Sequence, residues 1–212
     1  MLISKLKSCH FLLILLLAFF STAAQADKKI IVFGDSLSAA YGIAPEQGWV
    51  SLLSVYLNQR HSDLTVINAS ISGETTDSGL SRLPSVINRY NPNINMMIIA
   101  LGANDGLRGL EPDLIQSNLG KMIALCHENK IQVLLVGMQI PPNYGKAYTQ
   151  AIQKIYGDLS IKYQVRRIPF MLANVATHAT LMQEDGLHPT AEAQPIILNT
   201  ILMGLKPLLP KL

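Results

Sequence analysis

Three residues in the 212-residue sequence, one near its start and two near its end, are of the types that nucleophilic catalysis by a serine requires. Ser36 follows an apolar segment in Gly34-Asp35-Ser36-Leu37, and His188 comes three residues after Asp185. A serine hydroxyl is a weak nucleophile until a base takes its proton, and an imidazole oriented by a carboxylate can be that base. Within one turn the Asp185 carboxylate can reach one imidazole nitrogen and leave the other for Ser36. Taken singly, Ser36 can also be a helix cap and His188 a surface histidine, so these alternatives stay open here.

Two further segments could stabilise the negative charge that ester hydrolysis builds on the carbonyl oxygen. Gly73 ends the segment Ser70-Ile71-Ser72-Gly73, and Asn104 lies in Gly102-Ala103-Asn104-Asp105. The backbone N–H groups of Ser36 and Gly73 and the side-chain amide of Asn104 would donate to such an oxyanion. We also expect a helix to begin at Ser36, where the helix dipole would favour the same charge. Both segments are also typical of plain turns.

Short apolar runs alternate with longer, helix-like segments along the chain, which predicts an α/β fold. We expect strands at Lys28–Phe33, Leu64–Asn68, Asn95–Leu101, Ile131–Val136 and Arg167–Phe170. We expect helices at Trp49–Gln59, Thr76–Tyr90, Glu111–Glu128, Tyr148–Tyr163 and Thr190–Leu205, the second of them split in two by Pro84. Continuously apolar strands that alternate with helices favour a parallel sheet covered on both faces. The prediction is a three-layer α/β/α sandwich, flavodoxin-like, with a five-stranded parallel sheet in the order 2-1-3-4-5.

The polar segments follow directly after the predicted strands. Ser36 comes after the first strand, Gly73 after the second and Asn104 after the third, while Asp185 and His188 precede the last helix. In an open parallel sheet, ligands bind at the carboxyl ends of the strands. We therefore expect all five residues to meet at that edge.

The first 26 residues are typical of a secretory signal peptide. Lys5 and Lys7 precede an apolar run of ten residues, 11–20, and Ala24-Gln25-Ala26 resembles a cleavage site before Asp27. This run is too short to cross a bilayer as a helix, which takes about 20 residues. We therefore expect export, no stable membrane insertion, and a single mature domain at 27–212.

Charge and cysteine content narrow the functional classes of the mature chain. The sequence has 17 basic and 14 acidic residues, and removal of Lys5 and Lys7 leaves 15 basic residues, so the net charge is close to neutral. Such a chain lacks the basic surface of a nucleic-acid-binding protein. Cys126 is the one cysteine beyond the leader, and its apolar neighbours predict a buried structural thiol. The Cys and His spacings do not fit a zinc site.

Taken together, the four blocks around Ser36, Gly73, Asn104 and His188 resemble the SGNH (GDSL) hydrolase family. They are most similar to a periplasmic branch whose members act as thioesterases, lysophospholipases and arylesterases. The resemblance implies Ser36 as nucleophile, His188 as general base and acid, and Asp185 as the residue that orients His188. It implies an oxyanion hole of Ser36, Gly73 and Asn104, without a metal or another cofactor. Acyl esters, thioesters and lysophospholipids are the implied substrates, and we expect a monomer in the periplasm.

Two apolar side chains near the same edge are candidates for an acyl-binding groove. Leu107 follows the oxyanion asparagine, and Ile140 follows the fourth predicted strand. We expect both to line the groove and the Leu107 loop to close on long acyl chains. The alternative is that these loop residues pack on the core.

Three other functions remain as alternatives. An SGNH O-deacetylase of carbohydrates or cell-wall glycans would use the same triad with a shorter, polar groove. A metallophosphoesterase would use Asp35, Asn104, Asp105, Asp185 and His188 as metal ligands, but no Asp-x-His motif follows the first strand. A non-catalytic binding module would retain the fold alone.

Overall fold

The predicted strands form one parallel sheet in the computed structural model, which describes residues 28–61 and 63–209. The predicted signal peptide at 1–26 lies outside these described residues. The strands are β1 (Lys28–Gly34), β2 (Leu64–Asn68), β3 (Ile94–Ala100), β4 (Gln132–Val136) and β5 (Arg166–Ile168). All neighbours pair in parallel in the order β2-β1-β3-β4-β5, which confirms the predicted topology.

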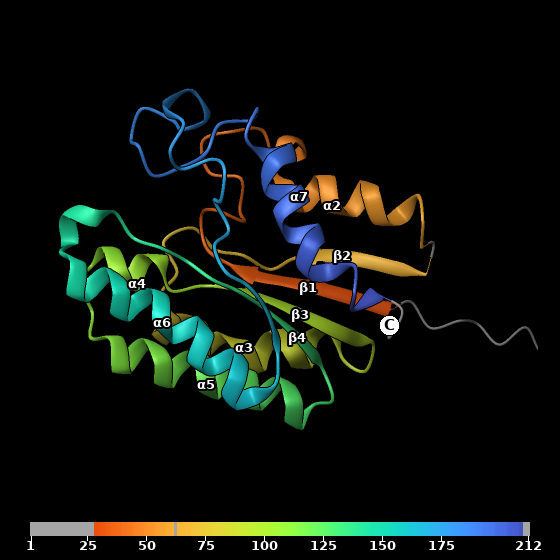
Figure 1. Cartoon of the computed structure of the whole chain (residues 1–212). Helices are drawn as coiled ribbons and strands as arrows, with labels where there is room; N and C mark the ends of the chain where they lie inside the picture. The colour runs from red at the N-terminus through yellow and green to blue at the C-terminus, as the bar shows by residue number, and fades with distance from the viewer. Residues whose placement is uncertain (1–27, 62, 210–212) are drawn as a thin grey trace, which may run out of the picture.

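Helices cover both faces of this sheet, as Figure 1 shows. The α-helices are α2 (Trp49–Asn58), α3 (Thr76–Tyr90), α4 (Ala103–Leu107), α5 (Pro112–Glu128), α6 (Lys146–Tyr163) and α7 (Gln194–Leu205). Three short 3-10 helices are η1 (Pro45–Gln47), η2 (Pro142–Tyr144) and η3 (Ala179–Leu181). One face carries α2 and α7, and the other carries α3, α5 and α6, so the predicted three-layer sandwich is confirmed. Within the described residues, no helix is both long and apolar enough to span a membrane.

The central strands owe their positions to side chains that are apolar on both faces. Residues 30–33 of β1 and 96–99 of β3 are fully buried, as expected for a parallel sheet between two helical layers. Cys126 of α5 is also fully buried, and burial raises the pKa of its thiol to about 12. The thiolate is therefore suppressed, and the predicted structural role of this cysteine is confirmed.

Trp49 connects the helical layer to the segment that follows β1. Its buried indole N–H donates to the Leu37 carbonyl at 3.0 Å, and its backbone N–H donates to Gln194 Oε1 at 3.0 Å. Gln194 is the first residue of α7. The start of α2 thus holds both the Leu37 segment and α7.

Pro84 does not split α3, so this prediction is wrong. The helix runs without interruption from Thr76 to Tyr90 with Pro84 inside it. Pro84 lies on the exposed side, whereas Leu83, Val86 and Ile87 are buried on either side of it. Proline removes one hydrogen bond from the ladder, and the packing of these neighbours offsets that loss.

The ends of most other elements differ from the predictions by one or two residues, and the start of α7 differs by four. β5 ends at Ile168 rather than at Phe170, because Pro169 has no N–H to donate to the ladder. The last helix begins at Gln194 rather than at Thr190, and residues 191–193 form turns before it. Neither difference moves the edge at which the polar segments meet.

The short helix α4 was not predicted, because its sequence is typical of a turn. Gly102 takes a φ of 111°, in the left-handed region that favours glycine, and Gly106 N–H donates to its carbonyl at 3.1 Å. Asp105 of α4 is buried and accepts hydrogen bonds from both the backbone N–H and the hydroxyl of Thr76, the first residue of α3. Asn118 of α5 donates to the same hydroxyl at 3.2 Å. These bonds fix α4, and with it Asn104, against α3 and α5.

We expect Asp105→Ala to lower the free energy of unfolding by about 2–3 kcal/mol, because it leaves the buried Thr76 donors unsatisfied. Asp113→Ala, in the exposed first turn of α5, is the matched control and should change stability by about 0.5 kcal/mol or less. Urea unfolding followed by circular dichroism measures both. An equal loss in the two variants would contradict this account of α4.

Candidate active site

Ser36 lies in a series of tight turns at the carboxyl end of β1. The N–H groups of Ser38 and Ala39 donate to the Asp35 carbonyl at 3.1 and 2.9 Å. The expected helix does not form, because Ala40 and Gly42 take left-handed φ values of 59° and 75° that interrupt it. The predicted contribution of a helix dipole at Ser36 is therefore wrong, and only the local N–H groups of this turn remain.

Asp185, His188 and Ser36 form a continuous line of hydrogen bonds. Asp185 Oδ2 lies 2.6 Å from His188 Nδ1, and His188 Nε2 lies 2.9 Å from Ser36 Oγ. Because an ionised carboxylate can only accept, Nδ1 carries the hydrogen and Nε2 accepts from the serine hydroxyl. The structure thus brings together the three residues that the sequence predicted as a triad.

Asp185 remains ionised in this arrangement. Desolvation acts to raise its pKa, but the backbone N–H of His188, the His188 side chain and the backbone N–H of Leu187 outweigh it and hold the pKa at about 2. Both N–H groups donate to Asp185 Oδ1 at 2.9 Å, which leaves Oδ2 for the imidazole. The carboxylate is therefore fixed by the same short loop that carries His188.

Gln183 and Tyr41 support this loop, and sequence reasoning missed both. Gln183 N–H donates to the His188 carbonyl at 2.7 Å, and its side-chain amide donates to the carbonyls of Tyr41 and Pro189 at 2.9 Å each. The Tyr41 ring lies against the imidazole, with 4.4 Å between ring centroids. The contacts of Tyr41 with Gln183 and His188 join residues more than 140 positions apart, so no local residue pattern reveals them.

Asn104 and Gly73 lie beside Ser36 at the carboxyl ends of the neighbouring strands. Asn104 Nδ2 donates to Asp35 Oδ2 at 3.2 Å and to the Glu74 carbonyl at 3.1 Å. Gly73 has a φ of 80°, and a Cβ built there meets no atom within 4 Å, so conformation rather than space favours glycine. The structure thus brings the predicted oxyanion residues together beside Ser36.

Asp35 is a buried carboxyl directly beneath this group. Desolvation raises its pKa to about 7; the Leu37 N–H opposes that rise, and the charges of Asp105 and Glu74 add to it. Sequence reasoning considered Asp35 only as a metal ligand. Among the described residues, no group of three or more His, Cys, Asp or Glu side chains is arranged to hold a metal ion.

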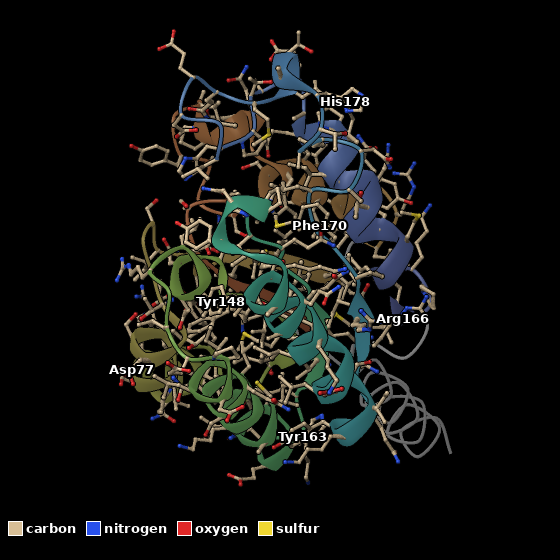
Figure 2. The ribbon with its side chains drawn as sticks, turned by 60° about the vertical axis from the view of Figure 1, so that its left-hand side comes forward. Asp77, Tyr148, Tyr163, Arg166, Phe170 and His178 are labelled. Carbon is tan, nitrogen blue, oxygen red and sulfur yellow. The ribbon has the colours of Figure 1, made fainter. Side chains whose placement is uncertain are left out.

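A cavity of about 280 Å³ opens beside the triad. Ser36, His188, Gly73 and Asn104 line its polar end. Its other walls are mainly apolar and include Leu37, Leu107, Ile140, Pro141, Leu172 and Leu187. Both predicted groove residues, Leu107 and Ile140, therefore reach the cavity. His178, by contrast, lies exposed on the connection between β5 and α7 (Figure 2).

Known proteins resemble this chain over most of its length. An arylesterase of Vibrio mimicus is 46% identical over 185 residues, which cover 87% of this chain and 92% of that protein. The thioesterase 1/protease 1/lysophospholipase L1 of Escherichia coli K12 is 36% identical, with 93% of this chain and 91% of that protein covered. The crystal structure of the psychrotrophic esterase EstA from a Pseudoalteromonas species, inhibited by monoethylphosphonate, has a TM-score of 0.81 and 38% identity, covering 87% of this chain and all of that one.

A family comparison agrees with the geometry and with these relatives. Residues 32–195 match the GDSL-like lipase/acylhydrolase family, and this segment contains Ser36, Gly73, Asn104, Asp185 and His188. The chain therefore belongs to the GDSL-like lipase/acylhydrolase family, the SGNH hydrolases that its four sequence blocks resemble.

Proposed function

We propose that this protein is a serine hydrolase that cleaves acyl esters and thioesters, with Ser36 as nucleophile, His188 as general base and acid, and Asp185 as the residue that orients His188. The observation that carries the proposal is the hydrogen-bonded line from Asp185 through His188 to Ser36, which ends at an apolar cavity. Family membership and relatives named arylesterase and thioesterase support the same reaction class.

Each group has a defined part in the reaction. Ser36 Oγ attacks the acyl carbonyl carbon while its proton passes to His188 Nε2, and Asp185 stabilises the imidazolium that forms. The N–H groups of Ser36 and Gly73 and the Asn104 amide donate to the carbonyl oxygen as it becomes negative. Collapse of this intermediate breaks the bond to the alcohol or thiol, which takes the proton from His188. Water then attacks the acyl-enzyme by the same route and releases the carboxylic acid.

The walls of the cavity favour an acyl chain as the bound group. Leu107, Ile140 and Leu172 provide apolar contacts next to the reacting serine, and burial of each methylene contributes about 0.8 kcal/mol. Medium- and long-chain esters, acyl thioesters and lysophospholipids all combine such a chain with a carbonyl. We propose that the mature domain, 27–212, acts on them as a monomer after export to the periplasm.

Ser36→Ala should lower kcat/KM on p-nitrophenyl esters by at least about 10⁴-fold, because no other described group is placed to form the acyl-enzyme. Initial rates across esters from acetate to palmitate measure this. Ser117→Ala, exposed on α5, is the matched control and should keep the wild-type rate.

A p-nitrophenyl phosphonate, which reacts with an activated serine, tests the nucleophile directly. The intact mass of the exported wild-type protein should increase by one phosphonyl group, and that of Ser36→Ala should not change. The same mass measurement should show that the mature chain begins at Asp27.

The same panel separates the alternative functions. Rates that peak at medium or long chains support an acyl hydrolase, whereas a peak at acetate would favour the O-deacetylase. Loss of activity on chelation with EDTA would favour the metallophosphoesterase. Full activity of Ser36→Ala would show that the triad assignment is wrong.

Asp185→Asn should lower kcat by about 10²–10⁴-fold, because the amide no longer fixes the imidazole tautomer. A second readout is stability in acid. The pKa of Asp185 is about 2 in the folded protein and 3.8 as an ordinary value, so its stabilising effect is present above pH 3.8 and lost as the pH falls toward 2. The melting temperature of the wild type should therefore fall more steeply over that range than that of Asp185→Asn. Parallel curves would contradict the assigned hydrogen bonds.

Leu107→Ser should shift the preference toward short esters, lowering the ratio of long-chain to short-chain kcat/KM by about tenfold. The physical reason is the loss of apolar contact where the chain passes Leu107. Leu114→Ser on the exposed side of α5 is the matched control. An unchanged ratio would remove Leu107 from the acyl groove and would leave the triad unaffected.

A further inference from the structure

The amide of Asn104 is held in one of its two possible orientations by acceptors alone. Its nitrogen lies 3.2 Å from Asp35 Oδ2 and 3.1 Å from the Glu74 carbonyl oxygen. The two ends of an asparagine amide have nearly the same shape, so the surrounding hydrogen bonds decide which end faces a given site. A backbone carbonyl and an ionised carboxylate both accept and cannot donate. The nitrogen end of Asn104, which an oxyanion requires, is therefore the end that faces them. Each acceptor takes one of its two hydrogens, so an oxyanion would take over the hydrogen that is donated here to the Glu74 carbonyl.

Of these two acceptors, only the Asp35 carboxylate can change its protonation state. It is fully buried next to Ser36, and its two carboxylate oxygens have different partners. Oδ1 accepts the Leu37 N–H at 3.0 Å and shapes the turn around Ser36, while Oδ2 accepts from Asn104. One carboxylate thus connects the turn that carries the nucleophile to the amide of the oxyanion hole.

We propose that Asp35 is a positioning residue for the hydrolysis: its ionised carboxylate holds the Asn104 amide with nitrogen toward the oxyanion, and protonation of Asp35 releases that orientation. A protonated Oδ2 carries an O–H donor and no longer accepts from the Asn104 nitrogen, so that of the two acceptors only the Glu74 carbonyl remains. The amide is then held less firmly, and the fraction of enzyme with the donor in place falls. This inference rests on the proposed function, because it acts through the oxyanion hole assigned there.

Charged groups on every neighbouring element bear on this ionisation. Asp105 on α4 and Glu74 before α3 both act against a charge on Asp35, and Glu74 is itself paired with Arg82 of α3 at 2.7 Å. Tyr156 of α6 is neutral and donates to the Leu101 carbonyl. On the side of the cavity, Ser36 separates Asp35 from His188. Desolvation dominates the balance, and the resulting pKa of about 7 places the change within the working range of a hydrolase.

The first test is the pH profile of Asp35→Asn, a substitution of the same shape that cannot titrate. At pH 8 we expect kcat to fall by about 10- to 100-fold with KM within about twofold, since the uncharged amide that replaces the carboxylate holds the Asn104 nitrogen less firmly. In the wild type, His188 and Asp35 must both lose a proton, so log kcat/KM should fall toward acid with a slope greater than 1. In Asp35→Asn only His188 remains, and the slope should be 1. Asp77→Asn, exposed at the start of α3 in Figure 2, should match the wild type.

Thermal unfolding reports the same ionisation without activity. The folded pKa of Asp35 is about 7 and the ordinary value is 3.8, so charging the carboxyl opposes folding. Its contribution to stability is greatest below pH 3.8 and declines as the pH rises to 7. Asp35→Asn should lack this decline, and its melting temperature should therefore exceed that of the wild type more at pH 8 than at pH 5.

A double-mutant cycle separates positioning from a purely structural role. If Asp35 acts through Asn104, then adding Asp35→Asn to Asn104→Ala should change kcat by no more than about twofold. Independent, multiplying losses would overturn the proposal, as would an Asp35→Asn enzyme with wild-type kcat and a steep acid limb. If Asp35→Asn does not fold, the pH profile of Asn104→Ala decides. Without the Asn104 amide, Asp35 has nothing to act through, so the acid side of log kcat/KM against pH should have a slope of 1. A slope equal to that of the wild type would overturn the proposal. Failure of the proposed function would appear separately, as activity that survives Ser36→Ala.

Discussion

The parallel pairing of β1 with β2 on one side and β3 on the other is the constraint on which the site depends. Val32 pairs with Asn68 and Gly34 with Ala100, so the three strands end at nearly the same level. Beyond the strands, Ile71 N–H still donates to the Gly34 carbonyl at 3.0 Å. Since the strand order reverses around β1, the segments after these strands diverge and leave a crevice between them. Ser36, Gly73 and Asn104 face that crevice because of the register, and no long-range motif in the sequence is needed to bring them there.

Three buried carboxyls lie beneath the crevice, and each is satisfied differently. Asp105 accepts from Thr76, Glu74 pairs with Arg82, and Asp35 accepts from Leu37 and Asn104. Burying such groups opposes folding, and a core of apolar residues would often be more stable. However, hydrogen bonds to a carboxyl are directional, so each carboxyl specifies one arrangement of a loop or short helix that apolar packing alone would leave undetermined. Asp105 fixes α4 and Asp35 fixes an amide, so stability is given up here for orientation.

The fold and the Asp185–His188 hydrogen bond could be predicted from the sequence because both depend on local patterns. Apolar runs reveal buried strands, and Asp185 and His188 are close enough in sequence to pair within one turn. The rest depends on contacts that no local pattern encodes. Pro84 stays within α3 because its neighbours pack on the core, and a turn-like sequence forms α4 because Thr76 binds Asp105. The turn at Ser36 is shaped by residues with left-handed φ rather than by helix propensity, and the partners of Gln183 and Asp35 become neighbours only once the sheet has formed.

The two halves of the site are supported in different ways, which explains how a loop can carry the proposed base, His188. Ser36 and Asn104 directly follow central strands, whereas Asp185 and His188 lie on the long connection before α7, beyond the sheet in Figure 1. This pair needs little outside support, because Asp185 accepts from the backbone of its own loop, and Gln183 at the start of that loop donates to the carbonyls of His188 and Pro189 at its end. Across the crevice, only the placement of the imidazole against Ser36 and Tyr41 has to be maintained. The pair proposed as the acid–base unit can thus lie on an irregular segment, while the proposed oxyanion donors depend on the spacing between strands and cannot be moved from the sheet.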